Sequence, residues 1–103
     1  MDLTEDCMNK YKALKDKLSH IEGLSFGIDS CVFDAAAQAR FTTSEHVCTI
    51  HYFATAEEIA EVYAAATIEL RDLRKGYHLR TQDFEDFEQA CKAYEGLHLF
   101  YRL

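Results

Sequence analysis

The stretch Val47-Cys48-Thr49-Ile50-His51-Tyr52-Phe53 decides the fold class. It is rich in the β-branched and aromatic residues that favour strands, and a strand in a sheet needs antiparallel neighbours to pair with. Upstream, residues 24–28 alternate apolar with small or polar side chains, which is typical of a half-buried strand. The sequence therefore predicts a sheet in the middle of the chain.

Residues 30–41, between these two strands, admit two interpretations. Ser30 could cap a helix through residues 34–40, which are rich in good helix formers. Alternatively, residues 31–33 and 39–43 could be two strands joined by a turn. We favour strands, because the strand at residues 47–53 needs partners.

A helix is predicted from Thr4 to Glu22, before the sheet. Apolar residues recur there at spacings of three and four, which places them on one side of a helix. Glu5 and Asp6 favour the start of a helix and Gly23 favours its end. The predicted stripe is Leu3, Cys7, Tyr11, Leu14, Leu18 and Ile21.

A second helix is predicted to begin at Thr55 and to end before Gly76. Thr55-Ala56-Glu57-Glu58 matches the capping box, in which hydroxyl and carboxylate pair with free backbone donors. Residues 77–80 would then form a connector or an edge strand. The predicted buried stripe of this helix is Ile59, Val62, Tyr63, Ala66, Leu70 and Leu73.

A third helix is predicted from Thr81 to Gly96, followed by a final strand over residues 97–103. The strand prediction depends on the alternation of apolar residues over that final segment. The predicted helical stripe is Phe84, Phe87, Cys91 and Tyr94, and the alternating strand residues are Leu97, Leu99, Tyr101 and Leu103.

These elements predict an α+β fold: a small antiparallel or mixed sheet of three to five strands with two or three helices packed on it. The 103 residues contain no linker or internal repeat, so we expect a single domain over residues 1–103. No apolar run approaches the about 18 residues of a membrane span. No secretory signal is visible, and we therefore expect a cytoplasmic protein.

The charge balance argues against direct nucleic-acid binding. Eighteen acidic and eleven basic residues give a formal charge of −7. Phosphate contacts need clustered lysines and arginines, and an acidic membrane surface would repel this chain as well.

The cysteines and histidines do not show the spacing of a metal or catalytic motif. The four cysteines (Cys7, Cys31, Cys48 and Cys91) could form two disulfides, but their apolar positions favour reduced structural thiols. The densest group is His46, Cys48 and His51, and His51 would point away from the other two on a strand. We expect no metal, no cofactor and no catalytic residue.

Two acidic clusters open the second and third predicted helices, where the helix dipole alone explains them. They could also imitate the phosphates of a nucleic acid, and exposed tyrosines are common at protein interfaces. The partner-binding residues predicted on this basis are Glu57, Glu58, Glu61, Asp83, Glu85, Asp86, Glu88, Tyr77 and Tyr101.

The functional expectation is a small acidic, non-enzymatic protein-binding module of the inhibitor or adaptor type. It would dock on a protein partner, with a basic nucleic-acid-handling enzyme such as a nuclease as one option, by analogy with inhibitors encoded by mobile elements. A homodimer is also compatible with the aromatic residues. The alternative is a small enzyme or small-ligand binder with a cleft between sheet and helices, using tyrosine, cysteine and His46, His51, His78 or His98.

Overall fold

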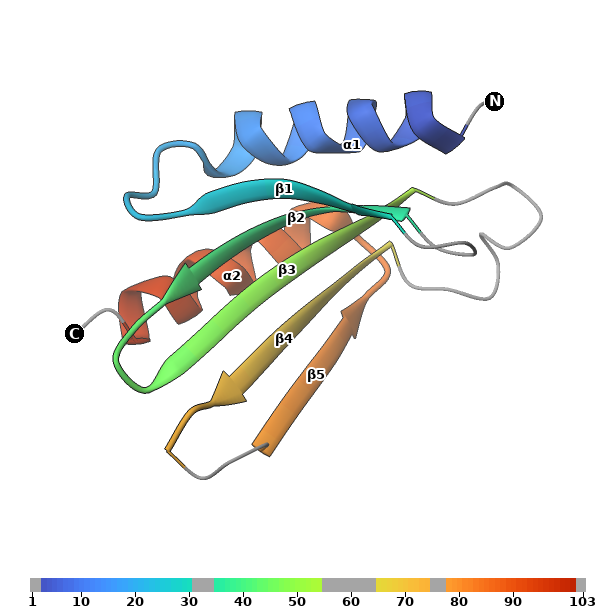
Figure 1. Cartoon of the computed structure of the whole chain (residues 1–103). Helices are drawn as coiled ribbons and strands as arrows, with labels where there is room; N and C mark the ends of the chain where they lie inside the picture. The colour runs from blue at the N-terminus through green and yellow to red at the C-terminus, as the bar shows by residue number, and fades with distance from the viewer. Residues whose placement is uncertain (1–2, 31–34, 55–64, 75–77, 102–103) are drawn as a thin grey trace.

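The computed structural model describes residues 3–30, 35–54, 65–74 and 78–101. Within them, the strands form one antiparallel sheet in the chain order β1-β2-β3-β4-β5 (Figure 1). The elements are α1 (Leu3–Leu18), β1 (Ser25–Ser30), β2 (Ala35–Thr42), β3 (His46–Ala54), β4 (Ala66–Asp72), β5 (His78–Phe84) and α2 (Phe87–Tyr101). The α+β prediction is confirmed, with five strands and two helices in the described part of the chain.

Both helices pack on the same face of the sheet. α1 lies against β1, β2 and β3, and α2 lies against β3, β4 and β5, while the two helices also contact each other. One hydrophobic cluster joins residues of both helices to this face of the sheet. The strand residues of this helix-covered face include Ala37, Ala39, Phe41, Cys48, Ile50, Ala66 and Ile68.

No described helix covers the opposite face, which we call the open face. Antiparallel sheets commonly keep one face in water, and polar side chains then alternate with the buried ones. The strand register places Gln38, Arg40, Thr49, His51, Thr67, Glu69, Arg71 and Asp83 there.

Tyr94 of α2 connects the helix layer to the sheet through packing and hydrogen bonds. Its side chain is fully buried, and its ring packs 5.5 Å from that of Phe41. Its hydroxyl lies 3.2 Å from the carbonyl oxygen of Ala39 and 2.9 Å from that of Cys48, so one proton is donated to carbonyls of two neighbouring strands. Burial raises the pKa of this phenol, because the phenolate would be poorly solvated there.

The first half of the chain confirms its predictions. The predicted helix at Thr4 is α1, although it ends at Leu18 rather than Glu22, and Gly23 then turns the chain at a φ of 82°. The predicted strands at residues 24–28 and 47–53 are β1 and β3. The preference for a strand over a helix is confirmed in β2, but residues 35–38, which were predicted to belong to a turn, are part of that strand. Residues 31–34 lie outside the described residues.

The prediction of a second helix through Leu73 is wrong where the structure describes it. Residues 55–64 lie outside the described part, but Ala66–Asp72 is strand β4. Ala66 and Leu70 fit both periods, since they are four residues apart. Ile68, which is only 4% exposed, decides the case, because it shares one face with them only in a strand.

The predictions for the third helix and the final strand are also wrong in part. His78–Phe84 is edge strand β5, so Thr81 and Phe84 belong to the sheet. α2 begins at Phe87 and continues through Gly96 to Tyr101, where a strand was predicted. The physical reason is burial at helical spacing: α2 covers the sheet with Ala90, Cys91, Tyr94 and His98.

Two general features complete the description. No helix among the described residues is long and apolar enough to cross a membrane. The three cysteines that the structure describes, Cys7, Cys48 and Cys91, are buried and free.

Candidate functional site

A groove opens at one end of the molecule, where the α1–β1 turn, the β2–β3 turn and the last turn of α2 meet. Its volume is about 560 Å³, and a neighbouring hollow of about 410 Å³ shares Glu22 and His98 with it. We call the larger of the two the end groove. Its polar and aromatic lining includes Glu22, Thr43, Glu45, His46, His98, Phe100 and Tyr101.

His98 forms the wall between the two hollows. It is 8% exposed, and its Nε2 lies 3.2 Å from the backbone oxygen of Glu22. A carbonyl oxygen can only accept a hydrogen bond, so Nε2 of His98 carries the proton that it donates to Glu22. The ring also meets Phe41 edge-on at 5.1 Å. This side chain therefore ties the α1–β1 turn to α2.

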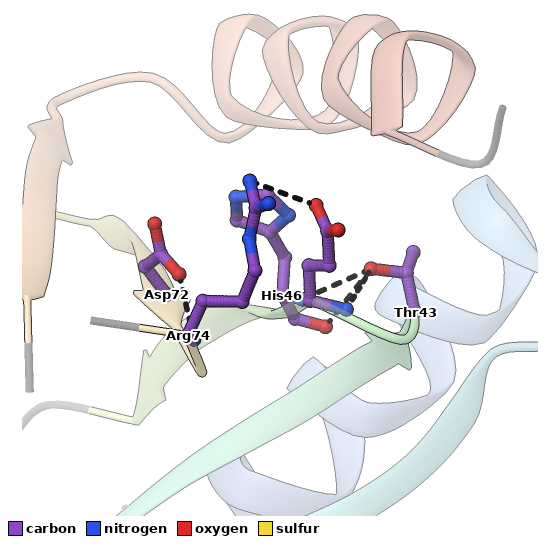
Figure 2. Close-up of polar contacts among 5 residues, drawn as sticks. Thr43, His46, Asp72 and Arg74 are labelled. Carbon is purple, nitrogen blue, oxygen red and sulfur yellow. Dashed lines mark hydrogen bonds and ion pairs between the residues drawn. The ribbon is translucent and has the colours of Figure 1, made fainter. Parts of the chain in front are cut away.

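The β2–β3 turn is held by hydrogen bonds of its own (Figure 2). The Oγ1 of Thr43 accepts from the backbone N–H groups of Glu45, at 3.3 Å, and His46, at 3.0 Å. Arg74, which follows β4, places its guanidinium 3.1 Å from the carboxylate of Glu45, and its backbone N–H donates to Asp72 at 2.9 Å. The end of β4 therefore braces this side of the groove.

Aromatic side chains form the other side and the rim. The ring of Tyr101 lies 4.5 Å from that of His46 and 4.8 Å from that of Phe100. Phe100 is 73% exposed and its neighbour Leu99 is 59% exposed. The last turn of α2 thus presents an apolar surface to solvent.

The described acidic residues of the predicted site gather at the other end of α2. Asp83 accepts a hydrogen bond from Thr67 at 2.7 Å, and Asp86 accepts one from the backbone of Glu88 at 3.1 Å. Glu88 also pairs with Lys17 of α1 at 2.6 Å, which raises the pKa of that lysine. Glu85 is exposed in the short connection between β5 and α2.

Tyr101 does not join this acidic cluster. It lies at the opposite end of α2, about 20 Å away at 1.5 Å per residue. The remaining predicted partner-binding residues, Glu57, Glu58, Glu61 and Tyr77, lie outside the described residues.

The other predicted reactive groups are dispersed. His46 and Cys48 lie on the helix-covered face and His51 on the open face, as their spacing predicts. His51 lies 3.5 Å from Glu69, but its buried Nε2 lacks the geometry of a hydrogen bond. Among the described residues, no three histidine, cysteine or acidic side chains are placed to hold one metal ion. His78 begins β5, and its side chain is not described.

The described thiols are poor nucleophiles. Burial raises the pKa of Cys48 to about 12, and burial, with the carboxylate of Glu88, raises that of Cys91 to about 12. Burial and then Asp6 raise the pKa of Cys7 in the same direction. A thiol acts as a nucleophile when it is ionised, so these three groups are suited to packing.

The alternative functional prediction named His46 and His98 for a cleft between sheet and helices, and both line the end groove, but Glu22 and Glu45 were not predicted as site residues. Glu22, Glu45 and His98 come from three separate segments. Glu22 was predicted as the end of the first helix, Glu45 lay between two predicted strands, and His98 lay in the predicted final strand, with no motif around any of them. The sequence feature that could have pointed to this site is that Glu22 and Glu45 are both charged residues beside turns. The strand register and the packing of α2 are what bring them together.

The comparisons with known proteins give no match: no family model, no curated protein and no solved structure is significantly similar to this chain.

Proposed function

We propose that this protein is a small acidic, non-enzymatic module that docks on another protein through the last turn of α2. The observation that carries the proposal is the exposure of two consecutive apolar residues at the end of a helix, Leu99 at 59% and Phe100 at 73%. Aromatic anchors surrounded by polar groups are typical centres of protein interfaces. Glu22 and Glu95 line the hollow that Leu99 also lines, and the carboxylate of Glu95 lies 3.2 Å from Nε2 of His20. Acidic residues beside exposed apolar ones suit a partner that is both apolar and basic.

In finer terms, we propose an inhibitor or adaptor that covers a basic, nucleic-acid-binding surface of its partner. The net charge of −7 supports attraction to such a surface. Glu57, Glu58, Glu61 and Tyr77 belong to this finer proposal together with Asp83, Glu85, Asp86, Glu88 and Tyr101. We also place the protein in the cytoplasm, and the three described cysteines, which are buried and free, are compatible with a reducing compartment.

The test is a quantitative capture experiment from the native host with a matched control. A Leu99→Ser, Phe100→Ser double variant removes the apolar anchors. Met8→Ser removes an apolar side chain of similar exposure, 41%, from α1. We expect a stoichiometric partner with the wild type and with Met8→Ser, and at least about tenfold weaker binding with the double variant.

Each outcome of this experiment has a clear meaning. Equal capture by all three proteins contradicts docking through α2. Affinity that does not change with salt removes the finer proposal of a phosphate-like surface, because that attraction is screened by ions. Self-association of the wild type, absent in the double variant, identifies a second copy of the chain as the partner.

A second candidate function is a small-ligand binder or enzyme that uses the end groove. The observation that favours it is the convergence of His46, His98 and Tyr101 in one groove between sheet and helix. Native mass spectrometry of the gently purified protein tests it. A small molecule that stays bound, and is lost in His98→Phe, supports this candidate over docking.

A further inference from the structure

We infer that the end groove is a receptor for a guanidinium group. This inference deepens the proposed function and rests on it for the origin of that group, which is an arginine side chain of the docked partner. A free guanidine compound has the same chemistry and is the other possible source.

The groove offers acceptors and negative charge. Two acidic residues, Glu22 and Glu45, line it, and the described lining contains no lysine or arginine. The groove also lies at the carboxyl end of α2, where the helix dipole is negative. A bound group should therefore be a cation rich in hydrogen-bond donors.

The chain itself shows how a guanidinium is bound at the edge of this groove. Arg74 lies 3.1 Å from the carboxylate of Glu45, the second of the two lining acids. Among the described residues, no cation pairs with the carboxylate of Glu22. One of two similar carboxylates is therefore occupied by a guanidinium, and the other is open to a ligand.

The aromatic walls favour a guanidinium over an ammonium. The rings of His46, Phe100 and Tyr101 lie along one side, with centroids 4.5 Å apart for His46 and Tyr101 and 4.8 Å apart for Phe100 and Tyr101. A planar guanidinium stacks on such rings and pairs with a carboxylate through two parallel N–H groups. An ammonium is a compact, strongly hydrated charge and gains less from a flat aromatic wall.

The experiment is an NMR titration of the ¹⁵N-labelled full chain with methylguanidinium chloride, against methylammonium chloride at the same ionic strength. We expect saturable shifts, of roughly millimolar affinity, at Gly23, in the β2–β3 turn and at the end of α2. Weaker or non-saturable shifts with methylammonium complete the expected result. Identical responses to the two salts, or shifts spread over all exposed acids, overturn the inference.

Charge-matched variants locate the site. Glu22→Gln should weaken methylguanidinium binding about threefold to fivefold. Glu5→Gln, an exposed acid in the first turn of α1, should leave it unchanged. Arg74→Ala should strengthen binding, because it frees the carboxylate of Glu45. Equal affinities for the Glu22 and Glu5 variants overturn the assignment of the site.

The origin of the group is tested with a blocked tripeptide, acetyl-Gly-Arg-Gly-amide, and its lysine counterpart. Tighter binding of the arginine peptide than of methylguanidinium supports an arginine of a protein partner. Tighter binding of methylguanidinium supports a free guanidine compound. The two proposals also fail separately. If the Leu99→Ser, Phe100→Ser variant loses partner capture but the wild type does not bind methylguanidinium, the docking proposal stands and the guanidinium receptor is ruled out.

Discussion

The two ends of α2 differ in how they use their conspicuous residues. At its start, Asp86 caps the helix, Glu88 pairs with Lys17, and Phe87 stacks on Tyr52 with ring centroids 3.9 Å apart. At its end, Leu99 and Phe100 face solvent. The start is therefore integrated into the fold, whereas the end is available to a ligand. In this helix the charged cluster is structural, and the apolar pair is the accessible surface.

The largest expected effect comes from Tyr94, which holds the middle of α2 and hence both ends in place. Tyr94→Ala should lower the free energy of unfolding by about 3–5 kcal/mol, since it removes a fully buried aromatic ring. Tyr94→Phe should cost only about 1 kcal/mol, because it removes the hydrogen bonds to two strand carbonyls but keeps the ring. Urea unfolding followed by circular dichroism measures both. Equal losses for the two variants would show that packing of the ring is unimportant.

The second prediction concerns Cys91, which lies in the first half of α2, and the pH dependence of the free energy of unfolding. Its pKa is raised from 9.0 to about 12, so below pH 9 the thiol is protonated in both folded and unfolded chains. Above pH 9 the unfolded chain releases this proton and the folded chain retains it. Stability should therefore fall as pH rises, by about 1.4 kcal/mol per pH unit for this thiol.

The measurement is the free energy of unfolding at several pH values above 9, under reducing conditions. The slope for Cys91→Ala should be shallower than the wild-type slope by that amount, while Cys48 continues to contribute in both proteins. Parallel slopes would mean that Cys91 ionises in the folded state as easily as in the unfolded one.

The smallest expected effect concerns the cap of α2. Asp86→Ala should lower the free energy of unfolding by about 1 kcal/mol, because the backbone N–H of Glu88 loses its acceptor. Glu85→Ala changes the charge equally one residue earlier and should have almost no effect. Thermal unfolding of the two variants compares them directly. If Glu85→Ala is the more damaging change, the acidic cluster is not organised around the cap.

The sequence predicts the first half of the fold better than the second half, for a physical reason. In α1, the apolar residues fit a helical period and no other, so local pattern and burial agree. In residues 97–101, Leu97, Leu99 and Tyr101 alternate as in a strand, yet helical burial uses Leu97, His98 and Tyr101. Because the exposed residues Leu99 and Phe100 are apolar, the sequence does not show a helical pattern here. Packing against the sheet decides between helix and strand.

The candidate site is less predictable than the fold. The acids that sequence reasoning selected do lie together at the start of α2 where they are described, but Asp83, Asp86 and Glu88 already have partners there. Tyr101 is the one described residue of that predicted set which lines the end groove. Its neighbours in space depend on strand register and on the contact of His98 with Glu22, which local sequence does not encode.

The order of the elements has a consequence for biosynthesis. Each strand pairs with the next one along the chain, so the sheet can assemble hairpin by hairpin as the polypeptide emerges from the ribosome. The apolar side of β4 and β5 nevertheless stays exposed to water until α2 has been translated, because α2 follows all the described strands. A nascent chain that ends before Phe87 would therefore expose an apolar sheet surface of the kind that chaperones bind.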